Sequence, residues 1–292
     1  MEEAVKRELG LNRLVAFGSV AGGCINRGRG YSTDKLGDVF IKFNNNDGAK
    51  VMFDGEYASL RAMYLTQTIR VPKPIKSISV DGQSCLVTEY IRMDRRWSNS
   101  SELGIKLAKM HLHNSSLLAA KEKESGFIGA SSESEDETLK PVTQFGFHTT
   151  TCCGFIPQKN DWNDDWVEFF AQNRLKPQVD LILEKTGDRE LLSLWPELER
   201  KIPSYFKDSD KIIPSILHGD LWSGNYSFAE DGPVIFDPAS FYGHSEFEMG
   251  ILTMFGGFSQ DFFTAYHSLI PKSEGFAERV RLYELFHHFN HW

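Results

Sequence analysis

The sequence predicts an α+β protein in two lobes, a small N-terminal lobe rich in strands and a larger lobe that is mainly helical. Its 292 residues are enough for about two domains of ordinary size. Short runs that alternate between apolar and polar residues dominate residues 1–92, as in half-buried strands. Apolar residues at helical spacing dominate residues 93–292. We therefore expect a sheet with one helix first and a helical lobe after it.

Composition and charge exclude several classes of protein. Lys and Arg number 32 against 40 Asp and Glu, a formal net charge of −8, whereas holding nucleic-acid phosphates requires clustered cations. No apolar run reaches the roughly 18 residues of a membrane helix, and the N-terminus has no apolar signal core. The cysteines are too few for a disulfide framework and form no C-x-x-C pair. We expect a cytoplasmic protein that binds neither nucleic acid nor membrane.

The N-terminal lobe is expected to contain several strands and one helix. Strands are predicted at Val15–Val20, Asp38–Phe43 and Ser84–Ile91. A glycine-rich stretch, residues 21–30, follows the first of them. Residues 47–66 carry apolar side chains at helical spacing, and Glu56 falls inside that apolar stripe. Because a buried carboxylate is costly without a cation or hydrogen-bond donors, Glu56 predicts a basic partner within this lobe.

The second lobe is expected to be built mainly from amphipathic helices. Helices are predicted around residues 103–114, around Trp162 and Trp166, and around residues 282–289. The acidic run at 131–137 is predicted to be a solvated loop. A short apolar run at 216–225 opens into a polar loop, and a short strand then ends at Asp237.

Five features in this order are consistent with phosphoryl transfer from ATP. They are a glycine-rich loop between early strands, Lys42 on a strand, Glu56 after 14 residues, Asp220 and Asn225 five residues apart, and Asp237 at 17 residues beyond Asp220. A fixed lysine neutralises nucleotide phosphates, and an acid holds that lysine in place. Carboxylate and amide oxygens are ligands that Mg²⁺ prefers. A further carboxylate can accept the proton of the substrate hydroxyl, and positioning and electrostatics supply the rest.

Each of these features, taken alone, has a simpler structural explanation. The glycines lack the G-x-G-x-x-G order and would suit a hairpin turn, Lys42 could be a solvated strand residue, and Glu56 could lie on a misassigned helix face. The segment HGDLWSGN is far more specific. A His-Gly-Asp with an Asn five residues after the Asp, followed by an apolar strand that ends in Asp, is hard to explain as an ordinary loop.

The motifs resemble those of a known family. HGDLWSGN followed by VIFDPAS resembles the aminoglycoside-phosphotransferase and choline-kinase branch of the protein-kinase-like fold. FGFHTTTCCGFIPQ, WNDDWVEFF, IFDPASFYGHSEFE and MFGGF, with the earlier GGCIN, VFIKFN, MFDGEYASL and VPKPI, resemble the fructosamine-3-kinase and ketosamine-3-kinase family over nearly the whole chain. The resemblance departs in the acidic run at 131–137. Members also continue where this chain stops at Trp292, so we expect it to lack the family's last segment.

The resemblance implies a fold and an activity. The fold is a two-lobed protein-kinase-like one, with an antiparallel-sheet ATP-binding lobe at 1–92 and a mainly helical catalytic and substrate lobe at 93–292. The activity is ATP- and Mg²⁺-dependent phosphorylation of the sugar 3-hydroxyl of ketosamines, such as fructosamine, ribulosamine or psicosamine adducts on proteins. The product decomposes and frees the amine, so glycated proteins are repaired.

The resemblance also implies roles for individual residues. Asp220 would accept the proton, Asn225 and Asp237 would hold Mg²⁺, and Lys42 would contact the phosphates and pair with Glu56. The remaining nucleotide contacts would come from a loop over the phosphates and from a hinge at the adenine, namely Gly22, Gly23 and Cys24, and Glu89, Tyr90 and Ile91.

The acceptor side of the site is predicted from aromatic and polar-tipped residues beside the catalytic loop. Sugars offer hydroxyls and an apolar face, which such side chains can meet. The candidates are His148, Trp222, Tyr242 and His244. Trp222 is preferred because it follows Asp220 by two residues. The alternatives are a structural histidine at 148 and core packing for Trp222.

Cys24 leads to a separate hypothesis about regulation. A thiol among backbone N–H groups and near a lysine has a lowered pKa and is more easily oxidised. It could brake nucleotide binding, and an intermolecular disulfide would make the protein a redox-linked homodimer rather than a monomer. The alternative is an inert small residue in a tight loop. For the whole protein, the competing hypotheses are an aminoglycoside- or choline-type phosphotransferase and an inactive kinase-like binding module.

Overall fold

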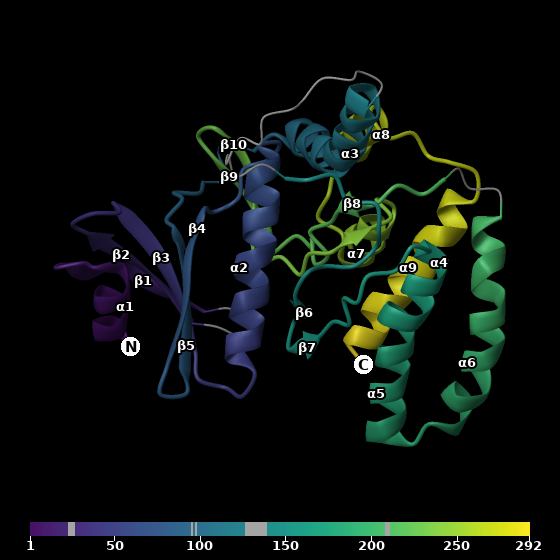
Figure 1. Cartoon of the computed structure of the whole chain (residues 1–292), viewed down its shortest axis with the longest axis horizontal. Helices are drawn as coiled ribbons and strands as arrows, with labels where there is room; N and C mark the ends of the chain where they lie inside the picture. Colours follow the sequence, from purple (N-terminus) through teal and green to yellow (C-terminus); the bar gives the residue numbers. More distant parts are fainter. Residues whose placement is uncertain (23–26, 95, 97, 126–138, 208–210) are drawn as a thin grey trace.

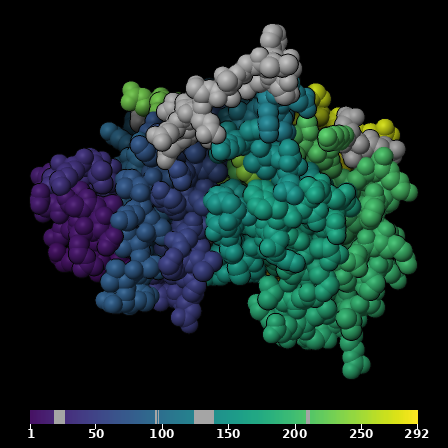
Figure 2. Space-filling model, viewed as in Figure 1, coloured from purple at the N-terminus to yellow at the C-terminus, as the bar shows by residue number. Residues whose placement is uncertain are grey.

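A sheet-containing lobe and a helical lobe pack side by side in this computed structural model (Figure 1), which describes residues 1–22, 27–94, 96, 98–125, 139–207 and 211–292. Gly23, Cys24 and the acidic run at 131–137 lie outside the described residues. In the space-filling view, the N-terminal lobe occupies one side of the molecule and the helical lobe the other (Figure 2). None of the helices within the described ranges is both long enough and apolar enough to cross a membrane.

In the described part of the first lobe, five antiparallel strands form one sheet in the order β1-β2-β3-β5-β4. The strands are β1 (Leu14–Gly22), β2 (Arg27–Thr33), β3 (Asp38–Asn44), β4 (Pro74–Val80) and β5 (Gln83–Glu89). The helices are α1 (Glu2–Leu9) and α2 (Ala49–Thr66). The strands predicted at 15–20, 38–43 and 84–91 correspond to β1, β3 and β5, and the helix predicted at 47–66 is α2.

The two faces of the sheet have different partners. Val39 and Ile41 of β3 pack with Val5 of α1 in a small apolar cluster. Lys42 points to the other face because successive side chains on a strand alternate. Its neighbour in register, Leu86 of β5, belongs to the larger core that includes α2. The alternation in β3 therefore sends one lysine toward the second lobe.

The second lobe contains the remaining described elements. Its helices are α3 (Ser100–Ser125), α4 (Trp166–Phe169), η2 (Phe170–Leu175), α5 (Lys176–Thr186), α6 (Arg189–Lys201), η3 (Ile202–Phe206), α7 (Phe247–Phe255), α8 (Gln260–His267) and α9 (Phe276–Asn290). Its short strands are β6 (Cys152–Cys153), β7 (Ile156–Pro157), β8 (Ser215–Ile216), β9 (Tyr226–Ala229), β10 (Gly232–Ile235) and β11 (Tyr242–Gly243).

Several predicted elements differ from the structure in extent, and the helix predicted around residues 282–289 is the C-terminal part of the longer α9 (Phe276–Asn290). The helix predicted at 103–114 is the middle of the longer α3, because the sequence after it remains compatible with a helix. The helix predicted around two tryptophans was wrong for Trp162, which lies before α4. Asp165 caps that helix by accepting a hydrogen bond from the Glu168 amide, so the first helical residue is Trp166.

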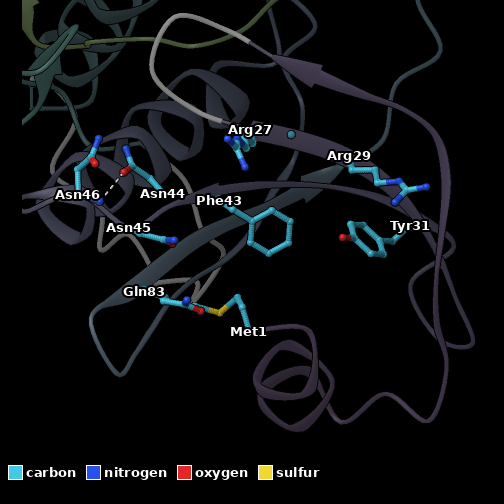
Figure 3. A pocket seen from close by; sticks show the side chains of 10 residues that line it. Met1, Arg27, Arg29, Tyr31, Phe43, Asn44, Asn45, Asn46 and Gln83 are labelled. Atoms are coloured by element: carbon cyan, nitrogen blue, oxygen red, sulfur yellow. Dashed lines mark hydrogen bonds between the residues drawn. The ribbon is translucent and has the colours of Figure 1, made fainter.

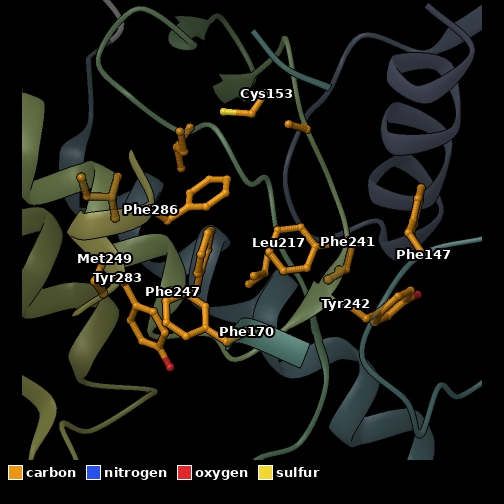
Figure 4. Packing of buried hydrophobic residues seen from close by; sticks show 14 of the residues in the cluster. Phe147, Cys153, Phe170, Leu217, Phe241, Tyr242, Phe247, Met249, Tyr283 and Phe286 are labelled. Atoms are coloured by element: carbon orange, nitrogen blue, oxygen red, sulfur yellow. The ribbon is translucent and has the colours of Figure 1, made fainter. Parts of the chain in front are cut away.

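The main core runs through both lobes without a break. Phe53, Leu60 and Met63 of α2 belong to the same buried cluster as Phe145 and Leu217 of the second lobe. Figure 4 shows the part of this cluster in the helical lobe, where aromatic rings pack against one another. The division of the chain into units at 1–92 and 93–292 therefore stays a prediction. The side chains of α2 pack in the same core as those of the second lobe.

Candidate active site

Lys42 holds together two acids that come from distant parts of the chain. Its ammonium is hydrogen-bonded to Glu56 of α2 and, at 2.5 Å, to Asp237 of the segment after β10. Lys42 and Glu56 are both buried. Burial by itself would lower the pKa of Lys42, but the Asp237 and Glu56 carboxylates outweigh it and hold that pKa well above its usual range. Lys42 is thus the cation that the burial of Glu56 requires.

The loop that carries Asp220 is held by a buried carboxylate. After β8, the backbone amides of His218 and Gly219 donate to the two oxygens of Glu248 at 2.6 and 3.0 Å. Gly219 has a φ of +81°, and a Cβ there would collide with the Ala239 carbonyl oxygen. Glu248 is fully buried on α7, so it fixes the backbone immediately before Asp220 from inside the helical lobe.

His218 closes the catalytic loop onto the strand that leads to Asp237. Its Nδ1 accepts from the Asp220 amide at 3.2 Å, so Nε2 carries the proton and donates to the Phe236 carbonyl at 2.9 Å. Burial lowers the pKa of His218, which keeps the ring neutral and preserves this arrangement. The histidine of the His-Gly-Asp motif therefore stabilises the conformation of the Asp220 loop.

The Asn225 side chain links the Asp220 loop to the segment that carries Asp237. The Asn225 amide nitrogen donates to the Asp220 carbonyl at 2.8 Å and lies 3.4 Å from its Oδ2 and 3.5 Å from the Asp237 carbonyl. The amide oxygen of Asn225 and the carboxylate of Asp237 are the kinds of donor that Mg²⁺ binds. Within the described ranges no cluster of three or more His, Cys, Asp or Glu could hold a metal. Mg²⁺ usually keeps several waters and substrate phosphates as ligands, so two protein oxygens suffice.

Asp220 has a pKa suited to exchanging a proton near neutrality. Burial, followed by the charges of Asp237 and Glu248, raises the pKa of Asp220 to about 7. Hydrogen bonds from the Cys153 thiol and the Asn225 amide oppose that rise. A carboxylate in such surroundings can take up the proton of an alcohol as that alcohol attacks a phosphoryl group.

The predicted adenine hinge follows β5. The amide of Glu89 donates to the Lys73 carbonyl at 2.9 Å, and the Tyr90 amide donates to the Asp38 carbonyl at 3.2 Å. Two of the three backbone amides are therefore already used, which leaves that of Ile91 as the candidate donor to an adenine. In the predicted phosphate loop, Gly22 ends β1 opposite Arg27, and the other two residues lie outside the described part of the chain.

The predicted acceptor residues fall into two groups. Trp222 is 41% exposed, lies over Gly224 and has its ring 6.3 Å from that of Phe255. His148 is also exposed. By contrast, the Tyr242 ring is buried in the core, and His244 bonds through Nδ1 to the Tyr283 hydroxyl at 2.8 Å. Packing roles fit Tyr242 and His244 better than contact with a sugar.

A cavity of about 570 Å³ lies elsewhere, on the sheet face opposite Lys42. It is lined by residues of β2, β3 and their surroundings, among them Arg27, Arg29, Tyr31 and Phe43 (Figure 3). These side chains lie on the same face as Val39 and Ile41, because they are in step with those residues along the paired strands. This cavity is therefore separate from the cluster of acids around Lys42.

Comparison with known proteins places the chain in a family. The model of the fructosamine kinase family matches residues 2–292. The chain belongs to the fructosamine kinase family. The chain is 50% identical over 293 residues to the ketosamine-3-kinase of Mus musculus, and the match covers 100% of this chain and 94% of that protein. It is 36% identical over 282 residues to a chloroplastic protein-ribulosamine 3-kinase of Arabidopsis thaliana, covering 96% and 78% of the two chains.

A solved structure agrees with this family assignment at the level of the fold. A crystal structure of a Haemophilus somnus protein, which its name assigns to the fructosamine-3-kinases, superposes with a TM-score of 0.77 at 22% identity. The match covers 99% of this chain and 88% of that one. The fold is the two-lobed one of protein-kinase-like phosphotransferases, as the sequence motifs predicted.

Two residues of the site in this fructosamine kinase family member were not found from the sequence. Glu248 could have been found by the reasoning that found Glu56, because it is a carboxylate within an apolar helical run. Cys153 gave no such signal. The Cys153 thiol opposes the rise in the pKa of Asp220, and this influence depends on how the hairpin of β6 and β7 folds, which no local pattern encodes.

Proposed function

We propose that this protein is an ATP-dependent kinase that phosphorylates the sugar 3-hydroxyl of ketosamines, including fructosamine, ribulosamine or psicosamine adducts on protein amines. The observation that carries the proposal is the meeting of Lys42, Glu56, Asp237, Asn225 and Asp220 at one place in a chain of this family. The names of the relatives, ketosamine-3-kinase and protein-ribulosamine 3-kinase, support the choice of acceptor.

The nucleotide would bind at the junction of the lobes. Lys42, fixed by Glu56, would contact the phosphates, and the Ile91 amide would meet the adenine. Asn225 and Asp237 would hold Mg²⁺, which when bound neutralises charge on the phosphates. Lys42 already bridges to Asp237, so the phosphate-binding cation and the metal-binding carboxylate are positioned by one contact.

Asp220 would take the proton from the attacking sugar hydroxyl. Its carboxylate is held by the loop that Glu248 and His218 fix, so the base is positioned before substrate arrives. Trp222, exposed two residues later, would offer its ring to the apolar face of the sugar. The protonated amine of a ketosamine is cationic, and a chain with a net charge of −8 does not repel it.

The setting we propose is cytoplasmic. In the described part of the chain, Cys85, Cys152 and Cys153 are free thiols, which supports a reducing compartment. The partners would be ketosamine-modified small molecules and glycated proteins.

A panel of acceptors tests the proposal. Purified protein is incubated with ATP, Mg²⁺ and a single acceptor, and phosphate incorporation into that acceptor is followed. The acceptors are fructoselysine, ribuloselysine, psicoselysine, an aminoglycoside and choline. Phosphorylation of a ketosamine at the 3-hydroxyl, with little turnover of the last two acceptors, supports it. Phosphorylation of the aminoglycoside or choline alone would overturn the acceptor class. Binding of nucleotide without turnover of any acceptor would favour an inactive module.

A further inference from the structure

The cavity on the sheet face opposite Lys42 is lined by two arginines that have no counter-ion. Arg27 and Arg29 of β2 both border it (Figure 3), and neither forms an ion pair or a side-chain hydrogen bond with any residue that the structure describes. The chain as a whole carries a net charge of −8, so composition does not explain two unpaired guanidinium groups at one cavity. Guanidinium groups in such a place favour an anionic ligand.

Arg29 carries a buried donor that no described residue satisfies. Its Nε is shielded from solvent and has no hydrogen-bond partner within the described ranges. Because a buried N–H without an acceptor costs free energy, such groups in native proteins are usually met by water, an ion or a ligand. Arg29 is in register with Ile41 of β3, whose side chain is fully buried, so the pairing of the two strands fixes where this donor lies.

Two aromatic rings line the cavity beside the arginines. Phe43 of β3 is half-buried and in register with Arg27, and its ring centroid lies 6.3 Å from that of Tyr31 at an interplanar angle of 72°. The Tyr31 hydroxyl donates to Glu2 at 2.8 Å, so Tyr31 contributes its ring to the cavity and not a free hydroxyl. Phe43 lies in the middle of the labelled side chains (Figure 3). A ligand ring can therefore pack on Phe43 with a guanidinium close by.

The cavity exists because α1 covers only part of this sheet face. Val5 of α1 packs with Ile41 in the small apolar cluster, whereas Phe43 lies at the edge of that cluster and is only partly buried. The remaining walls are polar and include Asn45, from the segment between β3 and α2, and Gln83 at the start of β5. A volume of about 570 Å³ suits a small organic molecule better than a single ion.

We propose that this cavity binds a small organic phosphate, a phosphate monoester attached to a planar ring. The monoester carries nearly two negative charges at neutral pH and three acceptor oxygens, so it pairs with both arginines, whereas a carboxylate would neutralise only one. The ring packs on Phe43, and the exposed amides of Asn45 and Gln83 bind polar substituents. Phe43 and Lys42 are neighbours on β3 and point to opposite faces, so this site is separate from the proposed nucleotide site and does not depend on the proposed function.

Phenyl phosphate is the probe, because it contains only a ring and a phosphate monoester. Its affinity for the full chain is measured by isothermal titration calorimetry, with and without a saturating non-hydrolysable ATP analogue and Mg²⁺. Phenol and inorganic phosphate are titrated in parallel, which separates the ring from the anion. The variants are Arg27→Gln, Arg29→Gln and Phe43→Leu, and Arg281→Gln at an exposed position of α9 is the matched control. The thermal unfolding midpoint of each variant shows whether it is folded.

The proposal predicts saturable binding of phenyl phosphate at roughly 1 mM or below, whether or not the ATP analogue is present. Each arginine variant weakens it by about 10-fold or more, Phe43→Leu weakens it by about threefold or more, and the control binds as wild type does.

Three results would overturn the site: no saturable binding, displacement by the ATP analogue, or wild-type affinity in both arginine variants. Inorganic phosphate that binds as tightly as phenyl phosphate would overturn the proposed class of ligand. If Phe43→Leu fails to fold, the arginine variants decide. The readout is binding rather than turnover, so a chain without kinase activity would overturn the proposed function and not this site.

Discussion

Removal of the Glu248 carboxylate should loosen the loop that carries Asp220. In Glu248→Ala, the His218 and Gly219 amides remain buried and lose their acceptors. Each unpaired buried group costs about 1–3 kcal/mol, so the free energy of unfolding should fall by roughly 2–6 kcal/mol. Glu248→Gln keeps one acceptor oxygen but turns an NH₂ toward the other amide, so we expect an intermediate loss.

Urea unfolding together with steady-state kinetics checks this expectation. An exposed acid on α9, Glu278, is the control, and Glu278→Ala should stay within about 0.5 kcal/mol of wild type. We expect kcat to fall in both Glu248 variants even where the protein remains folded, because Asp220 is then poorly positioned. A loss below about 1 kcal/mol in Glu248→Ala, with unchanged kcat, would refute the role of Glu248 as the anchor of the loop.

The dependence of stability on pH follows from the same contact. Burial would raise the pKa of Glu248, but His111, whose Nε2 lies 3.5 Å from Oε2 of Glu248, and the donating backbone amide of His218 outweigh it, so the folded-state pKa lies below the ordinary value of 4.5. The stabilisation from Glu248 is therefore fully present above 4.5 and is lost as pH falls through the folded-state pKa. The difference in stability between wild type and Glu248→Ala should shrink under acid conditions.

Three further predictions concern other parts of the site and its support. Lys42→Met should abolish turnover and destabilise the fold, because Glu56 stays buried without its cation; Lys42→Met combined with Glu56→Gln should restore the unfolding midpoint but not the activity. Gly55→Ala should destabilise by about 1–3 kcal/mol in urea unfolding, although Gly→Ala normally stabilises a helix, and a gain in stability would show that α2 can shift away from Thr150. Burial lowers the pKa of His287 to about 3, so between pH 6.5 and about 3 the unfolded chain binds a proton on this histidine and the folded protein does not. His287→Phe should therefore reduce the loss of stability on acidification by about 1.4 kcal/mol per pH unit over that range. An unchanged slope of stability against pH would contradict this.

Local patterns in the sequence were enough to predict three of the five described strands of the sheet, α2 and the burial of Glu56. Alternation in β3 shows that Lys42 lies opposite Val39 and Ile41, and the apolar spacing of α2 shows that Glu56 is buried. A buried carboxylate and a buried ammonium on the adjacent sheet are each costly unless they are paired, so the pairing of Lys42 with Glu56 follows from their burial.

Contacts between distant segments could not be predicted in this way. The influence of the Cys153 thiol on the pKa of Asp220 depends on how a short hairpin docks against α2. Tyr242 and His244 follow Asp237 closely in sequence, but Tyr242 of β11 is buried in the core, and His244, just after β11, is hydrogen-bonded to the Tyr283 hydroxyl. Closeness in sequence to Asp237 therefore did not reveal that these side chains pack in the core.

The central claim is that Asp220 takes the proton of a sugar hydroxyl while Lys42, Asn225 and Asp237 hold the nucleotide. A single-turnover assay with labelled ATP and fructoselysine on wild type and Asp220→Asn, paired with a direct measurement of nucleotide affinity, tests it best. We predict that the variant binds ATP with Mg²⁺ about as well as wild type and transfers phosphate slower by about 10²-fold or more. Transfer to fructoselysine at the wild-type rate in Asp220→Asn would contradict the account.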